Sequence, residues 1–104
     1  MTNTTAYQST TIGILGGGQL GRMLIQAAVD YNLEIHILDP AVDAPCSSIA
    51  HTFVQGSLTD YDTVYQFGQH CEVVTVEIEN VNTQALKALR DEGKKVYPEP
   101  EVIE

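Results

Sequence analysis

The stretch Thr11-Ile-Gly-Ile-Leu-Gly-Gly-Gly-Gln-Leu-Gly-Arg-Met-Leu24 joins an apolar strand, a glycine-rich turn and the start of a helix. Gly16, Gly18 and Gly21 match the pattern G-x-G-x-x-G. In this pattern the glycines allow a tight turn, close approach of a ligand to the backbone, and close packing of the helix on the strand. A helix start also offers unpaired N–H groups and a positive dipole end to an anion. We therefore expect the turn to face a phosphate or a carboxylate rather than to be purely structural.

The rest of the chain alternates between strand-like and helix-like patterns. Strands are predicted over 12–15, 33–38, 51–55, 72–78 and 94–97, and helices over 19–31, 58–69 and 82–93. Thr59 or Asp60 is the expected cap of the second helix, and Asn82 or Thr83 that of the third. This alternation predicts an α/β fold with a doubly wound, Rossmann-like parallel sheet of about five strands and helices on both faces.

The 104 residues are enough for one domain. We predict a flexible leader over residues 1–10, a domain over 11–100, and a loop with at most a short helix over 41–49. The net charge of -9 opposes general binding to nucleic acid or to an anionic membrane. The chain has no run of roughly 18 apolar residues, and its first residues lack a signal-peptide pattern, so we expect a cytoplasmic protein.

The cysteines and histidines show no spacing that is typical of a metal or redox site. Cys46 and Cys71 do not form a C-x-x-C pair, and we expect both to be buried thiols. His36, His51 and His70 lack the i, i+4 spacing of helical metal ligands. His36 lies within an apolar strand pattern, where we expect a histidine of the sheet end or of the core rather than a ligand-binding residue.

Acidic side chains follow two of the predicted strands. Glu77 and Glu79 alternate along the fourth strand, so they should share one face, where carboxylates could recognise hydroxyl or amine groups of a ligand. Capping of a helix or local pairing is the alternative for Glu79. Asp39 lies 18 residues after Gly21. Dinucleotide-binding folds place the acidic residue that binds the ribose roughly 20 residues after the glycine motif. Because Pro40 follows it, we favour a role for Asp39 in anchoring the turn.

Three segments together resemble one known family. They are Ile14-Leu-Gly-Gly-Gly-Gln-Leu-Gly-Arg-Met-Leu24, Leu38-Asp-Pro40 and Val73-Val-Thr-Val-Glu-Ile-Glu-Asn-Val81. They look like the amino-terminal, pre-ATP-grasp domain of the 5-(carboxyamino)imidazole ribonucleotide synthases, the ATPase subunits of phosphoribosylaminoimidazole carboxylase, in the ATP-grasp superfamily. The resemblance covers residues 11–100. A sister family, the formate-dependent glycinamide ribonucleotide transformylases, carries Glu where this chain has Gln19.

The resemblance implies a ligase that uses ATP and Mg²⁺ to activate bicarbonate as carboxyphosphate and carboxylates the amine of aminoimidazole ribonucleotide in purine synthesis. It implies a homodimer in which ATP and Mg²⁺ bind to later domains, so residues 101–104 would begin a linker to them. This chain would then hold no cofactor, no metal and no catalytic residue. The substrate-binding residues that carry over are Gly18, Gln19, Leu20 and Glu77, with Gly16, Gly17, Arg22 and Glu79 as further candidates.

Two other interpretations stay open at this point. The chain could be a self-contained regulatory module that binds a dinucleotide of the NAD type, with Asp39 on the ribose. The run Glu77-Ile-Glu-Asn-Val81 is not required by such a site and favours the ligase domain. The chain could also be a folded domain that has kept no ligand, which the residues alone do not separate from the first interpretation.

Overall fold

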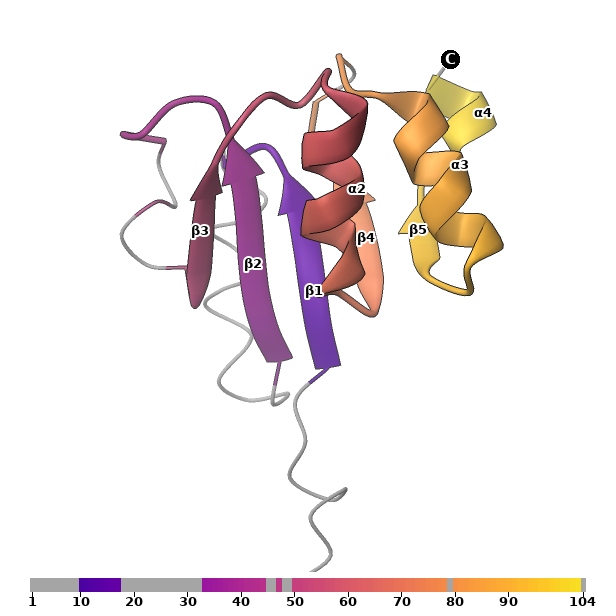
Figure 1. Cartoon of the computed structure of the whole chain (residues 1–104). Helices are drawn as coiled ribbons and strands as arrows, with labels where there is room; N and C mark the ends of the chain where they lie inside the picture. Colours follow the sequence, from indigo (N-terminus) through magenta and orange to yellow (C-terminus); the bar gives the residue numbers. More distant parts are fainter. Residues whose placement is uncertain (1–9, 18–32, 45–46, 48–49, 79, 104) are drawn as a thin grey trace, which may run out of the picture.

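A computed structural model describes residues 10–17, 33–44, 47, 50–78 and 80–103, and its core is a five-stranded parallel sheet (Figure 1). The strands lie in the order β3-β2-β1-β4-β5, and all four pairings are parallel. Their bounds are β1 Thr10–Leu15, β2 Leu33–Asp39, β3 Thr52–Gln55, β4 Val73–Val76 and β5 Lys95–Tyr97. The predicted α/β fold with about five parallel strands is confirmed.

The strand order reverses beside β1. The chain proceeds from β1 to β2 and β3 on one side, then crosses over and adds β4 and β5 on the other side. In parallel sheets the loops after two such strands leave in opposite directions, and the crevice between them is where ligands bind. The carboxyl ends of β1 and β4 flank this crevice, because Leu15 lies opposite Val76 in the register.

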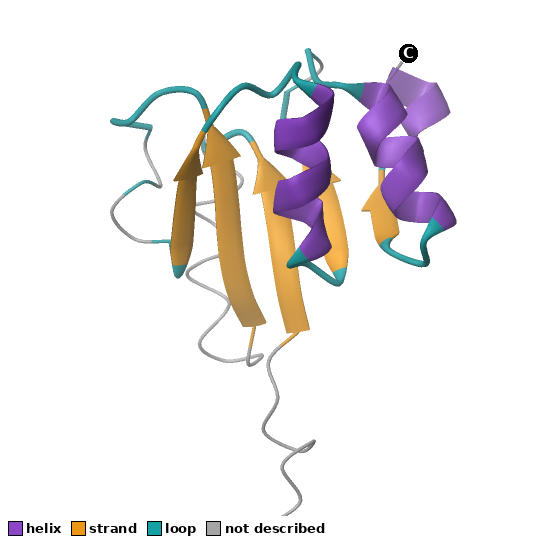
Figure 2. Cartoon of the chain, in the orientation of Figure 1, coloured by secondary structure: helices purple, strands orange, loops and turns teal. Residues whose placement is uncertain are grey.

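Three helices follow in the second half of the chain (Figure 2). They are α2 (Tyr61–Gln69), α3 (Thr83–Asp91) and the short α4 (Pro100–Ile103). The Asp60 side chain accepts a hydrogen bond from the Thr63 N–H (2.9 Å), and that of Asn82 from the Ala85 N–H (2.9 Å). Of the two residues predicted as possible caps for each helix, Asp60 is the N-cap of α2 and Asn82 is the N-cap of α3. Leu58 and Thr59, which were predicted to begin the second helix, form a turn before α2.

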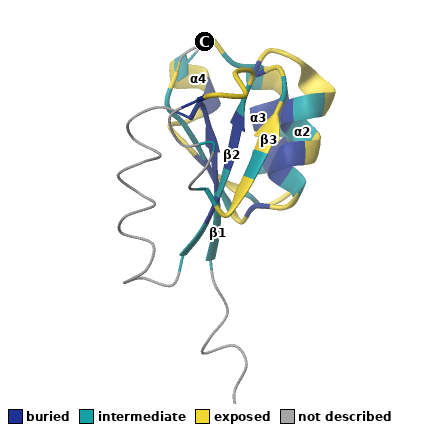
Figure 3. Ribbon diagram, turned by 90° about the vertical axis from the view of Figure 1, so that its left-hand side faces the viewer, coloured by how far each residue is buried: buried dark blue, intermediate teal, exposed yellow. Residues whose placement is uncertain are grey.

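Both faces of the sheet are apolar and buried, as a doubly wound sheet requires. One face carries Ile14, Ile35 and Ile37, all fully buried, together with partly buried neighbours. The other carries Leu15, Leu38 and Val74, which join the core under α2 and α3 (Figures 1 and 3). The predicted helix 19–31 lies outside the described residues, so the described helices α2 and α3 cover a single face.

Several predicted bounds need correction. Thr10 already pairs with Leu33, so β1 begins inside the predicted leader. The third strand was predicted to begin at His51, but β3 begins at Thr52; the His51 N–H donates to the Ile35 carbonyl of β2, and its Nδ1 accepts the Ile35 N–H. The fourth strand was predicted to reach residue 78, but β4 ends at Val76 and the chain bends afterwards. Residues 101–103 of the predicted linker are helical in α4.

The described cysteine and His36 serve the fold. Cys71 is 1% exposed, and burial raises the pKa of its thiol to about 11, which keeps it protonated and unreactive. Cys46 lies outside the described residues. The Nε2 atom of His36 lies 2.5 Å from the Glu34 carboxylate on the same strand. Within the described part of the chain, no helix is long and apolar enough to cross a membrane.

Replacing Gly68 with alanine is expected to destabilise the fold. A Cβ at this position in α2 would lie 2.4 Å from Cδ1 of the fully buried Leu89 in α3. Overpacking costs about 1–3 kcal/mol, which exceeds the gain of about 1 kcal/mol from the better helix propensity of alanine. Thermal unfolding followed by circular dichroism should show a lower Tm for Gly68→Ala. Gln66→Ala, at an exposed position of the same helix, serves as the control. A raised Tm for Gly68→Ala would contradict the close packing of Gly68 against Leu89.

The pairing of α4 with α3 should depend on pH. The Arg90 guanidinium donates two hydrogen bonds to Glu101 (2.7 and 3.0 Å) and one to Glu99 (3.1 Å). The hydrogen bond from Arg90 lowers the pKa of the Glu101 carboxyl from 4.5 to about 2. A depressed pKa stabilises the folded state above the unfolded pKa, and this contribution is lost as the pH falls toward 2.

We therefore expect Glu101→Gln to lower the Tm at pH 5–7 and to have a much smaller effect at pH 2. Melting curves of both proteins across this range test the expectation. The difference at neutral pH should shrink in high salt because the pair is exposed. A Tm difference that persists unchanged at pH 2 would contradict an ionic origin.

Candidate functional site

The glycine turn begins directly at the end of β1. Gly16 has a φ of +108°, in the left-handed region that favours glycine, and its N–H donates to the Leu38 carbonyl (2.8 Å). A Cβ on Gly16 would lie 3.5 Å from Cβ of Glu77 and 3.6 Å from Cγ2 of Ile78. The tight turn predicted at Gly16 is therefore present, and it lies against the first residues of the Glu77–Val81 run.

Gly17 is held by the side chain of Asp39. The Gly17 N–H donates to Oδ2 of Asp39 (2.7 Å), and the Ala41 N–H donates to Oδ1 (2.8 Å). The role of Asp39 in anchoring the turn after β2, which the sequence favoured, is confirmed by the second bond. The first bond, over 22 residues of sequence, was not expected. Gly17 is also tightly surrounded, because an added Cβ would lie 3.0 Å from the Ala44 Cβ.

Glu77 follows β4 on the other side of the crevice. Its N–H donates to the Leu15 carbonyl (3.0 Å). This bond extends the β1–β4 ladder by one step and fixes the position of the Glu77 backbone. The residue is half-buried. The structure therefore brings Gly16, Gly17 and Glu77 together at the strand-order reversal, while ligand contact by any of them stays a prediction. The other predicted site residues, Gly18, Gln19, Leu20, Arg22 and Glu79, lie outside the described residues.

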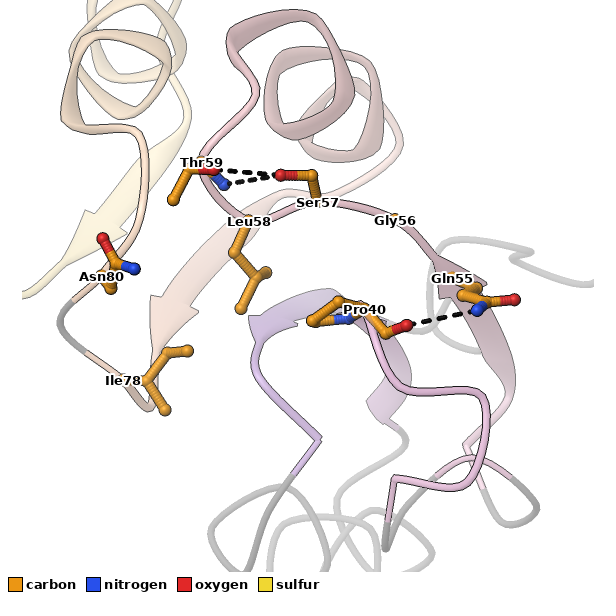
Figure 4. A pocket seen from close by; sticks show the side chains of 8 residues that line it. All are labelled: Pro40, Gln55, Gly56, Ser57, Leu58, Thr59, Ile78 and Asn80. Carbon is orange, nitrogen blue, oxygen red and sulfur yellow. Dashed lines mark hydrogen bonds between the residues drawn. The ribbon is translucent and has the colours of Figure 1, made fainter.

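A cavity of about 530 Å³ opens at the same edge of the sheet (Figure 4). Its apolar walls are Pro40, Leu58 and Ile78, and the hydroxyls of Ser57 and Thr59 hydrogen-bond each other (3.1 Å) on its rim. The remaining lining residues are Gln55, Gly56 and Asn80. Its volume is within the range of small-molecule sites, which are concave and largely apolar with a few polar groups.

The residues from the loop after β3 were not predicted as part of a site. Their sequence, Gln55-Gly-Ser-Leu-Thr59, is that of an ordinary turn before a helix, and it contains no charged group that would suggest chemistry. Ile78 and Asn80, by contrast, belong to the run that the sequence had singled out. The cavity therefore joins an expected motif to an unexpected loop.

The described residues do not form a metal site. No three His, Cys, Asp or Glu side chains within the described ranges gather closely enough to hold an ion.

The profile of the ribonucleotide synthetase preATP-grasp domain family matches residues 9–104. The chain belongs to this family. The N5-carboxyaminoimidazole ribonucleotide synthase of Staphylococcus aureus is 48% identical over 79 residues, which are 76% of this chain and 21% of that protein. The preATP-grasp domain thus spans about a fifth of the length of the curated relatives it matches. The resemblance drawn from the glycine string and the Glu77–Val81 run is confirmed.

Solved structures agree with this assignment of the preATP-grasp domain. The N5-carboxyaminoimidazole ribonucleotide synthetase of Thermotoga maritima superposes with a TM-score of 0.82 at 31% identity, over 90% of this chain and 26% of that one. The synthase of Aspergillus clavatus, in complex with ADP and 5-aminoimidazole ribonucleotide, gives 0.78 at 38% identity, over 93% and 26%. None of these findings supports the alternative of a dinucleotide-binding module.

We expect that NAD and NADP do not bind measurably to this preATP-grasp domain. Both carboxylate oxygens of Asp39 already accept backbone N–H groups, so the residue is poorly placed to read a ribose. Calorimetric titration of each dinucleotide into the chain checks this expectation. A micromolar Kd that Asp39→Ala abolishes would restore the dinucleotide interpretation.

Proposed function

We propose that this chain is the amino-terminal, nucleotide-substrate-side domain of an ATP-dependent ligase that carboxylates 5-aminoimidazole ribonucleotide with bicarbonate in de novo purine biosynthesis. The observation that carries the proposal is the meeting of the glycine turn and Glu77 at the strand-order reversal, with 3.5 Å between the Glu77 Cβ and a Cβ built on Gly16. Ligands of parallel α/β sheets bind at this position. The synthase of Aspergillus clavatus, whose structure resembles this chain, was solved with that ribonucleotide and ADP.

The chemistry of the two sides of the crevice suits a ribonucleotide. A glycine turn before a helix favours the phosphate, and a facing carboxylate accepts hydrogen bonds from ribose hydroxyls or from an exocyclic amine. We assign the first role to Gly18, Gln19 and Leu20, which follow Gly17 in the sequence, and the second role to Glu77. Gly16 and Gly17 shape the turn, while Arg22 and Glu79 are candidates for further contacts. The cavity of about 530 Å³ beside the crevice is large enough for part of a mononucleotide.

The same proposal places ATP and Mg²⁺ outside this chain. The synthase of Staphylococcus aureus has been solved with ADP, and this chain covers 26% of it. In the proposed ligase ATP activates bicarbonate, and the residues of this domain bind and orient the ribonucleotide so that its amine faces the activated carbon. We further propose that the ligase is a homodimer in the cytoplasm, where its soluble substrates occur.

Glu77→Gln in the ligase that carries this domain should weaken the use of the ribonucleotide. A hydrogen bond to a charged group contributes about 1.5–3 kcal/mol, so kcat/KM for the ribonucleotide should fall by roughly ten- to a hundredfold. The KM for ATP and the Tm should hardly change. Steady-state kinetics with each substrate varied, together with a melting curve, measure all three quantities.

Glu72→Gln provides a matched control for this variant. Glu72 is an exposed residue just before β4, at the opposite end of that strand from Glu77. The same substitution there should leave the kinetics unaltered. A lower Tm with unaltered kinetics for Glu77→Gln would remove Glu77 from the site and leave it a structural role.

A further inference from the structure

Asp39, the last residue of β2, connects three loops at the binding edge of the sheet. Its Oδ2 atom accepts the Gly17 N–H from the turn after β1, and its Oδ1 accepts the Ala41 N–H from the turn after β2. Its backbone carbonyl accepts the Gly56 N–H from the loop after β3 (3.1 Å). Gly56 lines the cavity. One residue thus fixes the relative positions of the glycine turn and of one cavity wall.

The bond to Gly17 also removes one N–H group from the set that a ligand could use. Charge-assisted hydrogen bonds of this kind are short and strong, and this one measures 2.7 Å. The Asp39 carboxylate occupies the place that an anion would take at this N–H, and its negative charge repels a second anion there. A phosphate on the turn must therefore bind away from Gly17.

We propose that Asp39 is a positioning residue: it locks the glycine turn at Gly17 to the loops after β2 and β3, and its carboxylate keeps the phosphate of the ribonucleotide off the Gly17 N–H. The proposal rests on the proposed function, which supplies the ribonucleotide. Packing supports the lock, because Gly17 has no room to shift toward Ala44 or Ile37. A Cβ on Gly17 would lie 3.0 and 3.1 Å from their side chains.

Asp39→Asn separates this role from simple packing. Asparagine has the same shape, but it offers a single acceptor oxygen and two N–H donors. Either the Gly17 N–H or the Ala41 N–H must then face an NH₂ group. One of the two bonds is lost in every orientation of the amide, and the negative charge is lost with it.

Two measurements test the proposal. In this chain, labelled with ¹⁵N, hydrogen exchange of the Gly17 amide should become at least tenfold faster in Asp39→Asn, because its acceptor loses the negative charge in either orientation of the amide. In the ligase that carries this domain, the KM for 5-aminoimidazole ribonucleotide should rise about tenfold, with the KM for ATP unchanged. Asp43→Asn, an exposed carboxylate in the same loop, is the matched control and should alter neither quantity.

The outcomes distinguish the two proposals. If the wild-type ligase does not carboxylate the ribonucleotide, the proposed function fails, and the exchange of Gly17 still decides whether Asp39 locks the turn. Unchanged exchange at the Gly17 amide overturns the lock, and faster exchange with an unchanged KM overturns the positioning role. If Asp39→Asn does not fold, Asp39→Glu tests the position of the acceptors instead, because it keeps both oxygens and the charge and displaces them by one methylene group.

Discussion

The central position of β1 is the constraint on which the rest of the structure depends. This strand pairs with β2 on one side and β4 on the other, so its backbone groups are satisfied by both neighbours. The ladders extend past the strand itself, through the Gly16 N–H to Leu38 and the Glu77 N–H to Leu15. Because these bonds form at the same end of β1, the glycine turn and the acidic residue are brought to one edge. The candidate site is therefore a consequence of the strand pairing.

Close packing of the helices on this sheet depends on small residues. A Cβ on Gly13, in the middle of β1, would lie 2.5 Å from Sγ of Cys71 and 2.9 Å from the Phe67 ring. Gly68 makes the corresponding space in α2 for Leu89 of α3. Because of these small residues, α2 and α3 pack closely on the face of the sheet opposite Ile14. Interiors packed this closely transmit small shifts from one element to the next. The rigid layer beneath the crevice suits a site whose geometry must be held closely.

The charge of the domain determines how it can bind an anion. With a net charge of -9, the overall field repels a phosphate, and attraction must come from local groups such as N–H groups and a helix dipole. The Asp39 carboxylate beside Gly17 adds to that repulsion at one point of the turn. Its two backbone hydrogen bonds offset the cost of placing a charge there. An anionic ligand would therefore have to fit this local geometry, because the overall field opposes its binding.

Local chemistry along the chain determined the α/β class, the two helix caps and the turn at Gly16. Asp60 and Asn82 each bond to an N–H three residues ahead, so the spacing that predicts the cap is the spacing that makes the bond. The anchoring of the turn by Asp39 was predictable for the same reason. The resemblance to known synthases rested on residues 14–24 and 73–81, and it depended on exact strings rather than on periodicity.

Tertiary structure alone decided the bond of Asp39 to the turn after β1, the end of β4 at Val76 and the walls of the cavity. Gly17 lies 22 residues from Asp39, and they meet because β1 and β2 pair in one particular register. The cavity takes its lining from the ends of three strands, so no single segment carries its pattern. Contacts between distant segments depend on register and on the bend of each loop, and the spacing of neighbouring residues does not encode either.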